Sequence, residues 1–294
     1  MTRVVVLGAN GQLGSDVTAA FAADGHEVSA LTHQDVEITS PESVKLAFEK
    51  ARPEIVINAA AFSNVERCET DPVLAFRVNA LGARNAARAC CVHGATIVHI
   101  STDYVFDGAK DTPYTEVDGP CPLNVYGNSK LSGEFFVRST NPRHFVVRVC
   151  GIYGRNPCRS KDGLNFVDLM LKLSKEREEI RVVADEFVTP TPTVEIARQL
   201  IVLSRTTRYG LFHATAEGSC SWYEFARSIF DLLGTKARLV QARPGEFSAK
   251  VPRPRNSVLE NAALKREGLN VFRHWKEGLQ EYLSNRRTFS VQKV

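Results

Sequence analysis

Residues 3–14 read Arg-Val-Val-Val-Leu-Gly-Ala-Asn-Gly-Gln-Leu-Gly, a β-branched run followed by three glycines at a spacing of three. The apolar run at 3–7 predicts a short buried strand of a parallel sheet. Gly8, Gly11 and Gly14 permit a tight turn into a helix, whose first amide groups have no partner and attract a phosphate. In this setting between strand and helix, the glycines indicate a loop that binds the pyrophosphate of a dinucleotide.

Strands and helices alternate from this loop as far as residue 149. Apolar runs predict further strands at 26–31, 55–57, 96–100 and 145–149. Helical spacing predicts helices at 14–24, 41–50, 71–92 and 124–138, with Ser40 and Asp71 as N-caps. The alternation predicts an α/β fold, a Rossmann-type doubly wound parallel sheet with ligands at the carboxyl edge of its strands.

The alternation weakens after residue 150, which predicts a change in organisation. Helical patterns remain at 163–177 and 221–233, and 252–257 is rich in proline and arginine. We therefore expect a dinucleotide-binding domain over 1–150. Residues 151–294 would mainly form a smaller α/β substrate-binding lobe, with some segments returning to the first domain.

Composition narrows the class of protein. The 294 residues are 44% apolar and 24% charged, with a net charge of +4 that is spread along the chain. No basic block favours nucleic acid, and no apolar stretch has the roughly 18 residues that suggest a membrane span. The seven cysteines show no CxxC pair, and no ligand cluster calls for a metal. We expect a cytoplasmic protein, with no nucleic acid or membrane partner, whose reduced cysteines mostly pack as small apolar residues.

A second motif supplies groups that can move a proton. Thr102 follows a predicted strand, and Tyr126 and Lys130 lie four residues apart on one face of a predicted helix. We expect the Lys130 ammonium to lower the pKa of Tyr126 from about 10. Tyr126 would then act as general acid toward a carbonyl that receives hydride, while Thr102 donates a hydrogen bond to the same oxygen. Lys130 would also hold the nicotinamide ribose.

The residues after the second predicted strand bear on the choice of cofactor. That strand ends at Leu31-Thr32-His33 without the carboxylate that favours the ribose of NAD. NADP(H) is therefore favoured and NAD(H) is the alternative. His33 is read either as a cofactor contact or as an exposed loop histidine. Glu37 and Ile38 come next and would line the adenine.

The chain resembles the extended short-chain dehydrogenase/reductase superfamily and, within it, the dTDP-4-dehydrorhamnose reductase family. The resemblance covers almost the whole chain, and its most specific parts are the run Ser-Thr-Asp-Tyr-Val-Phe-Asp-Gly and a late Arg-Pro-x-Asn-Ser. The matching segments are 8–14, 57–61, Asn79, 101–108, 122–130, Arg148, 153–154, 218–223 and 253–257.

The resemblance implies reduction of the 4-keto group of a nucleotide-linked 6-deoxyhexose by NADPH or NADH. The catalytic set would be Thr102, Tyr126 and Lys130. Val65, Thr102 and Asp103 would contact the sugar and Arg253 the pyrophosphate, unless Arg253 only forms a surface ion pair. Family members are often dimers, so a homodimer is a candidate assembly. The cofactor would contact Gly8, Asn10, Gly11, Gln12, Leu13, Gly14, His33, Glu37, Ile38, Ala61, Phe62, Ser63, Tyr126 and Lys130.

Three positions depart from the family pattern. Gly151 replaces a tryptophan that packs on the substrate, Glu37 replaces an aspartate, and His33 replaces an arginine. The loss of the aromatic side chain leaves open which sugar and nucleotide are bound.

The same residues bear on other functions found among related proteins. A 4,6-dehydratase is disfavoured because Tyr104 stands where a second carboxylate would be needed. A nucleotide-sugar 4-epimerase keeps the same catalytic set and stays open. So does a non-catalytic NADP-binding regulatory subunit that resembles the β subunit of methionine adenosyltransferase.

Overall fold

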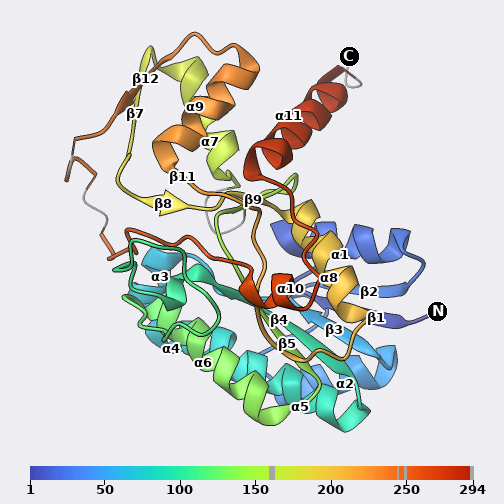
Figure 1. Ribbon diagram of the computed structural model, residues 1–294. Coiled ribbons are helices and arrows are strands. Elements are labelled where there is room, and N and C mark those ends of the chain that lie inside the picture. Colours follow the sequence, from blue (N-terminus) through green and yellow to red (C-terminus); the bar gives the residue numbers. More distant parts are fainter. Residues whose placement is uncertain (159–162, 244, 248–249, 292–294) are drawn as a thin grey trace.

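The computed structural model describes residues 1–158, 163–243, 245–247 and 250–291, and its main feature is a six-stranded sheet (Figure 1). All neighbouring strands are parallel. In order across the sheet, the strands are β10 (Gly210–His213), β5 (His144–Val149), β4 (Thr96–Thr102), β3 (Ile55–Asn58), β1 (Arg3–Leu7) and β2 (Glu27–Leu31). The predicted doubly wound parallel sheet is confirmed, and its strand order reverses between β1 and β3, where such sheets bind ligands.

Helices cover both faces of the sheet (Figure 1). Side chains of β1 alternate between two cores, with Val4 and Val6 on one face and Val5 and Leu7 on the other. Helices α1 (Gln12–Ala23) and α8 (Thr193–Ser204) cover the first face. Helices α2 (Pro41–Ala51), α5 (Ala83–His93) and α6 (Val125–Thr140) cover the second. As predicted, Ser40 caps α2, and its hydroxyl accepts from the Ser43 amide at 3.2 Å.

The single helix predicted over 71–92 is interrupted. Asp71 caps it as expected, but α4 (Pro72–Phe76) passes into a π-helical turn, η1 (Arg77–Gly82), before α5. The wide turn faces Asn79 inward, where its amide group bonds the backbone of Phe62 at 2.8 and 3.0 Å and the Ser129 hydroxyl at 2.9 Å. A further short helix, α3 (Val65–Thr70), was not predicted, although Asn64 is a recognisable N-cap.

The second half of the chain forms a lobe above the carboxyl edge of the sheet (Figure 1). Its core packs Phe225 and Ile229 against Trp275 and Leu279. The lobe helices are α7 (Phe166–Glu176), α9 (Trp222–Leu233) and α11 (Trp275–Val291). The short strand pairs are β7 (Glu179–Val182) with β12 (Arg238–Gln241), β8 (Phe187–Val188) with β11 (Cys220–Ser221), and β6 (Ile152–Tyr153) with β9 (Thr191–Pro192). Helix α8 and strand β10, which follow residue 151, pack with the sheet domain.

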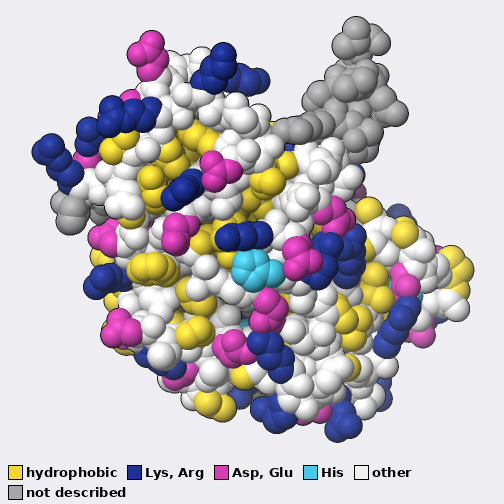
Figure 2. Space-filling model, turned by 45° about the horizontal axis from the view of Figure 1, so that its top comes forward, with side chains coloured by type: hydrophobic (Ala, Val, Ile, Leu, Met, Phe, Trp, Pro, Cys, Tyr) yellow, Lys and Arg dark blue, Asp and Glu magenta, His cyan; other side chains and the backbone are white. Residues whose placement is uncertain are grey.

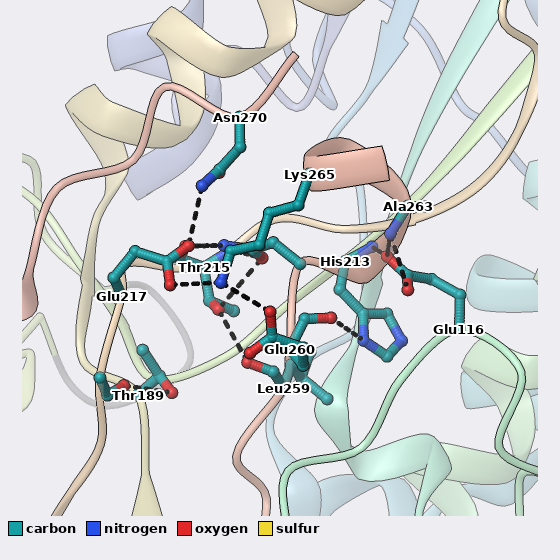
Figure 3. A network of polar contacts seen from close by, with 12 residues as sticks. Glu116, Thr189, His213, Thr215, Glu217, Leu259, Glu260, Ala263, Lys265 and Asn270 are labelled. Atoms are coloured by element: carbon teal, nitrogen blue, oxygen red, sulfur yellow. Dashed lines mark hydrogen bonds and ion pairs between the residues drawn. The ribbon is translucent and has the colours of Figure 1, made fainter. Parts of the chain in front are cut away.

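A polar network joins β10 to the segment that carries Arg253 and to α10 (Ala262–Arg266) (Figure 3). The Glu116 carboxylate accepts from the amides of His213 and Ala263, and the ring of His213 lies 3.1 Å from the carbonyl oxygen of Glu260. Burial lowers the pKa of His213 to about 3, so its ring is neutral at pH 7. Lys265 binds the carboxylates of Glu217 and Glu260 at 2.7 and 2.6 Å. The network therefore ties β10 to α10 and to the chain segment that precedes this helix.

The cysteines only partly match the expectation that they pack as small apolar residues. Four of them are buried: Cys68, Cys90, Cys150 and Cys220. The expectation is wrong for Cys91 and Cys121, which are exposed. In the part of the chain that the structure describes, no helix is both long and apolar enough to cross a membrane.

Candidate active site

A cavity of about 740 Å³ opens between the carboxyl edge of the sheet and the lobe. It lies where the strand order reverses, and its volume suits a small-molecule ligand. Every residue that the sequence assigned to the site lines this cavity. These residues are Gly8, Asn10, Gly11, Gln12, Leu13, Gly14, His33, Glu37, Ile38, Ala61, Phe62, Ser63, Val65, Thr102, Asp103, Tyr126, Lys130 and Arg253.

The glycine loop leaves no room for side chains. Gly8 has a φ of +76°, and a Cβ there would lie 2.9 Å from the backbone of Ala60. A Cβ on Gly14 would lie 2.2 Å from the carbonyl oxygen of Gly8. Helix α1 begins at Gln12 behind Gly11, which offers no side-chain cap to the first amides. The loop therefore has the compact backbone and the open helix N-terminus that fit the pyrophosphate of a dinucleotide.

We predict that Gly14→Ala disrupts this loop. The added methyl group would overlap the Gly8 carbonyl, and relieving that overlap must move the backbone that faces the cavity. We expect a loss of stability of about 1–3 kcal/mol and loss of tight dinucleotide binding. Urea denaturation and a fluorescence titration with NADPH measure the two effects. Gly119→Ala is the matched control, because a Cβ on Gly119 meets nothing within 4 Å.

The end of β2 differs from the sequence prediction in one respect. A carboxylate does lie there, because Asp35 accepts from the amide and the hydroxyl of Thr32 at 2.8 and 2.7 Å. Asp35 is thereby engaged by Thr32 and does not line the cavity. The side chain of His33 is largely exposed and lies 3.5 Å from that of Glu37, so both readings of this histidine have support. Arg77, which was not predicted from the sequence, also lines the cavity. The pKa of Glu37 is lowered mainly by its hydrogen bond with the Thr39 amide, and the charges of His33 and Arg77 contribute to the same effect.

Tyr126 and Thr102 both line the cavity. Asn124 caps α6 by accepting from the Gly127 amide at 2.8 Å, which places Tyr126 in the first turn of the helix. The Thr102 hydroxyl is near enough to Tyr126 to influence its pKa. Burial raises the pKa of Tyr126 well above its ordinary value, and the Thr102 hydroxyl only partly opposes this effect. The phenol therefore carries its proton at neutral pH.

The prediction that Lys130 lowers the pKa of Tyr126 is wrong for this structure. Lys130 is buried, and its Nζ donates to the carbonyl oxygen of Ile100 at 2.5 Å. The ammonium is therefore bonded to strand β4 of the sheet. Burial lowers the pKa of Lys130 to about 8, although the nearby Glu134 favours the ammonium. Glu134 is itself held by Arg148, at 2.9 and 2.7 Å.

The position of Lys130 predicts a pH dependence. Below pH 8 its ammonium can donate hydrogen bonds to a ribose, and above that pH it loses its proton. We expect affinity for NADPH to fall as the pH rises through about 8. Lys130 also makes unfolding less favourable as the pH rises from about 8 to 10.5, because only the unfolded chain still binds the proton there. NADPH titrations and urea denaturation of wild type and Lys130→Met over this pH range test the two predictions. If affinity and stability depended on pH in the same way in both proteins, Lys130 would be excluded as the cause.

Asp103 lies beneath the Thr102 hydroxyl. Thr102 donates to Asp103 Oδ1 at 2.9 Å. Burial raises the pKa of Asp103, and hydrogen bonds with Ser257 and Cys150 oppose the rise. Ser257 and Cys150 come from distant parts of the chain, and the sequence analysis did not assign them to the site.

Arg253 lies at the other end of the cavity, near Glu186 and Tyr104. Burial raises the pKa of Glu186, and the positive charge of Arg253 opposes the rise. The Asn124 side chain, which also caps α6, donates to the Pro252 carbonyl at 3.0 Å. This bond links the segment that carries Arg253 to α6, the helix that carries Tyr126.

The structure accounts for the glycine at position 151. Gly151 has a φ of +56°, and a Cβ there would lie 2.7 Å from a methyl group of Val188. No larger side chain fits without moving β8. The aromatic residues of the lobe that line the cavity were not predicted, because three of them lie in helical patterns that suggest core packing and Phe187 belongs to no motif. They are Phe166, Phe187, Trp222 and Phe225.

Over the residues that the structure describes, no group of three or more His, Cys, Asp or Glu side chains could hold a metal ion. The groups that line the cavity include the hydroxyls of Thr102 and Tyr126, the buried ammonium of Lys130, two guanidinium groups and the glycine loop. This set can bind a dinucleotide together with a second anionic ligand and can transfer a proton between oxygen atoms.

Comparisons with known proteins agree with this geometry. A family model described as the RmlD substrate binding domain matches residues 1–288. The chain is 40% identical to the spore coat polysaccharide biosynthesis protein SpsK of Bacillus subtilis, over 97% of this chain and 98% of that protein. It is 37% identical to the dTDP-4-keto-6-deoxy-D-glucose reductase of Streptomyces niveus, over 95% and 96%.

Among solved structures, the chain is also similar to dTDP-4-dehydrorhamnose reductases. A dTDP-4-dehydrorhamnose reductase of Clostridium acetobutylicum has a TM-score of 0.92 and 40% identity, with 97% of this chain and 99% of that chain covered. The Bacillus anthracis reductase in complex with NADP has a TM-score of 0.92 and 37% identity, with the same coverage. A UDP-glucose 4-epimerase of Thermus thermophilus, 22% identical with a TM-score of 0.81, shares the fold. The chain belongs to the family of the RmlD substrate binding domain.

Proposed function

We propose that this chain reduces the 4-keto group of a nucleotide-linked 6-deoxyhexose with NADPH, as a dTDP-4-dehydrorhamnose reductase does. The observation that carries the proposal is that Thr102, Tyr126 and Lys130 line one cavity together with the glycine loop and Arg253. Relatives that match nearly the whole chain are named as reductases of dTDP-linked 4-keto sugars.

The residues divide the chemistry among them. Bound NADPH supplies a hydride for the carbonyl carbon. Amides at the start of α1 hold the pyrophosphate, and Lys130 donates hydrogen bonds to the nicotinamide ribose. When substrate binds, the Thr102 hydroxyl would turn from Asp103 to donate a hydrogen bond to the keto oxygen and fix its position. Tyr126 transfers its proton to that oxygen, so the ketone gains a hydride and a proton and becomes an alcohol.

NADPH is proposed as the preferred cofactor, with NADH as the second choice. His33 and Arg77 place two basic side chains at the end of the cavity near Glu37, where the adenosine ribose would lie. A 2′-phosphate would gain from such neighbours, whereas the free hydroxyl of NADH would not. The Bacillus anthracis relative was solved with NADP.

Oxidation of NADPH in the presence of dTDP-4-dehydrorhamnose tests the proposal. We expect loss of NADPH absorbance only when protein and keto-sugar are both present. A 4-epimerase causes no net oxidation, so the assay separates the two activities. Tight NADPH binding without turnover on several nucleotide-linked keto-sugars would contradict the proposal and favour a regulatory subunit.

A homodimer in the cytoplasm stays part of the proposal. The relatives are named as a spore coat polysaccharide biosynthesis protein and as dTDP-4-dehydrorhamnose reductases, which supports a biosynthetic role. Light scattering on the purified protein tests the assembly, and a mass equal to that of one chain would exclude a stable dimer.

A further inference from the structure

Phe187 is a large apolar side chain that lines a cavity and stays accessible to solvent. Its side chain is 39% exposed, although burial of a phenylalanine is favourable. The neighbouring aromatic residues are engaged with one another. The ring of Phe166 lies 4.6 Å from that of Trp222 and 5.4 Å from that of Phe225. Among the described rings, Phe187 makes no such contact, so a face of its ring is open to the cavity.

The backbone fixes the direction of this ring. Val188, the next residue on β8, is buried against Gly151, and the alternation of a strand therefore turns Phe187 the other way. The amide of Phe187 donates to the Arg255 carbonyl at 2.8 Å, and its carbonyl accepts from the Ser257 amide at 3.0 Å. Phe187 is thus bound to the segment that carries Arg253.

The surroundings of Phe187 belong to the lobe. Strand β8 pairs with β11, where Phe187 lies opposite Ser221, and the strand crosses between the lobe and the sheet domain in Figure 1. Figure 2 shows that apolar and charged side chains alternate over the molecular face it presents. An aromatic ring and a guanidinium that line the same cavity suit a ligand that has both a flat ring and an anionic group.

The parts of a nucleotide sugar can be assigned in turn. The hydroxyls of Thr102 and Tyr126 face the keto group, and Arg253 is the cation for the diphosphate. The nucleobase is the one flat, weakly polar part of the ligand that remains. Phe187 is the open aromatic face that remains on the same wall as Arg253.

We propose that Phe187 is the stacking platform for the pyrimidine base of the nucleotide sugar. The inference rests on the proposed function, because it assumes a nucleotide-linked substrate. Stacking between a base and an aromatic side chain is typically worth enough to change affinity about ten-fold. Phe187 would therefore set affinity for the nucleotide without touching the reacting carbonyl.

Calorimetric binding of dTDP and of inorganic pyrophosphate to the NADP-loaded protein tests this assignment. Phe187→Ala should weaken dTDP binding about ten-fold, whereas Phe187→Tyr, which keeps the ring, should bind dTDP like wild type. Neither variant should change affinity for pyrophosphate or for NADPH. Phe135→Ala is the control, because Phe135 is 56% exposed on α6 and does not line the cavity.

Two results would overturn the assignment. Equal dTDP affinity in Phe187→Ala and wild type would show that the base binds elsewhere. Equal losses for dTDP and pyrophosphate would show that the substitution disturbs Arg253 rather than a stacking contact. The assay does not depend on turnover. Phe187-dependent dTDP binding without keto-sugar reduction would contradict the proposed function alone, and reduction with Phe187-independent dTDP binding would contradict this inference alone.

Discussion

Tyr126→Phe is expected to lower turnover by about a hundred-fold or more and to leave NADPH affinity nearly unchanged. The substitution removes the hydroxyl that would protonate the keto oxygen and keeps the ring that packs against Tyr104 at 5.8 Å. Burial keeps the phenol protonated in the wild type, so the proton is present before the reaction starts. Steady-state rates and a fluorescence titration with NADPH measure the two quantities.

Tyr209→Phe provides the control for this variant. Tyr209 packs against Phe145 and lies outside the cavity, so loss of its hydroxyl should leave turnover unchanged. Wild-type turnover in Tyr126→Phe would exclude the phenol as the acid. Thr102 would then be the remaining hydroxyl in contact with the same site.

Lys130→Ala is expected to weaken NADPH binding about ten-fold or more and to slow turnover about a hundred-fold. The ammonium lies at the foot of the cavity, bonded to the Ile100 carbonyl, where it can also reach a ribose. Because Lys130 is buried, its removal leaves Glu134 with one positive neighbour fewer and creates a void. Cofactor titration and steady-state rates on the folded variant measure the effect.

Lys130→Met distinguishes the effect of losing the ammonium charge from the effect of losing side-chain volume. Methionine fills much of the same space without the ammonium, so it should show the same losses as alanine if the charge is what matters. Lys45→Ala is the surface control, since that side chain is 59% exposed on α2. Unchanged cofactor affinity in both Lys130 variants would refute the contact with the ribose.

The sheet domain was predictable because its signals are local. β-Branched runs mark the buried strands, and Ser40 and Asp71 are caps that act within three residues. The π-helical turn at 77–82 was not predictable, because it depends on the bonds of Asn79 to Phe62 and Ser129. The strands of the lobe are only two to four residues long, which is too short for a period to be recognised.

The cavity residues that belong to recognisable sequence motifs were predictable. Residues at the carboxyl ends of parallel strands must meet at one edge, so the glycine loop and Thr102 were expected to lie together. Phe187 and Ser257 come from other segments and join the cavity only through folding. The shift in the pKa of Tyr126 was predicted with the wrong sign, because spacing on a helix does not reveal that the Lys130 ammonium bonds the sheet.

Transfer of an isotope label tests the central claim most directly. NADPH deuterated at C4 of its nicotinamide would be incubated with the protein and a dTDP-linked 4-keto-6-deoxyhexose, and the sugar product examined by nuclear magnetic resonance. The geometry of Thr102 and Tyr126 predicts one deuterium at C4 of the sugar, beside a hydroxyl whose proton came from the protein. A product without deuterium at C4, or an unreacted keto-sugar beside bound NADPH, would contradict reduction at this site.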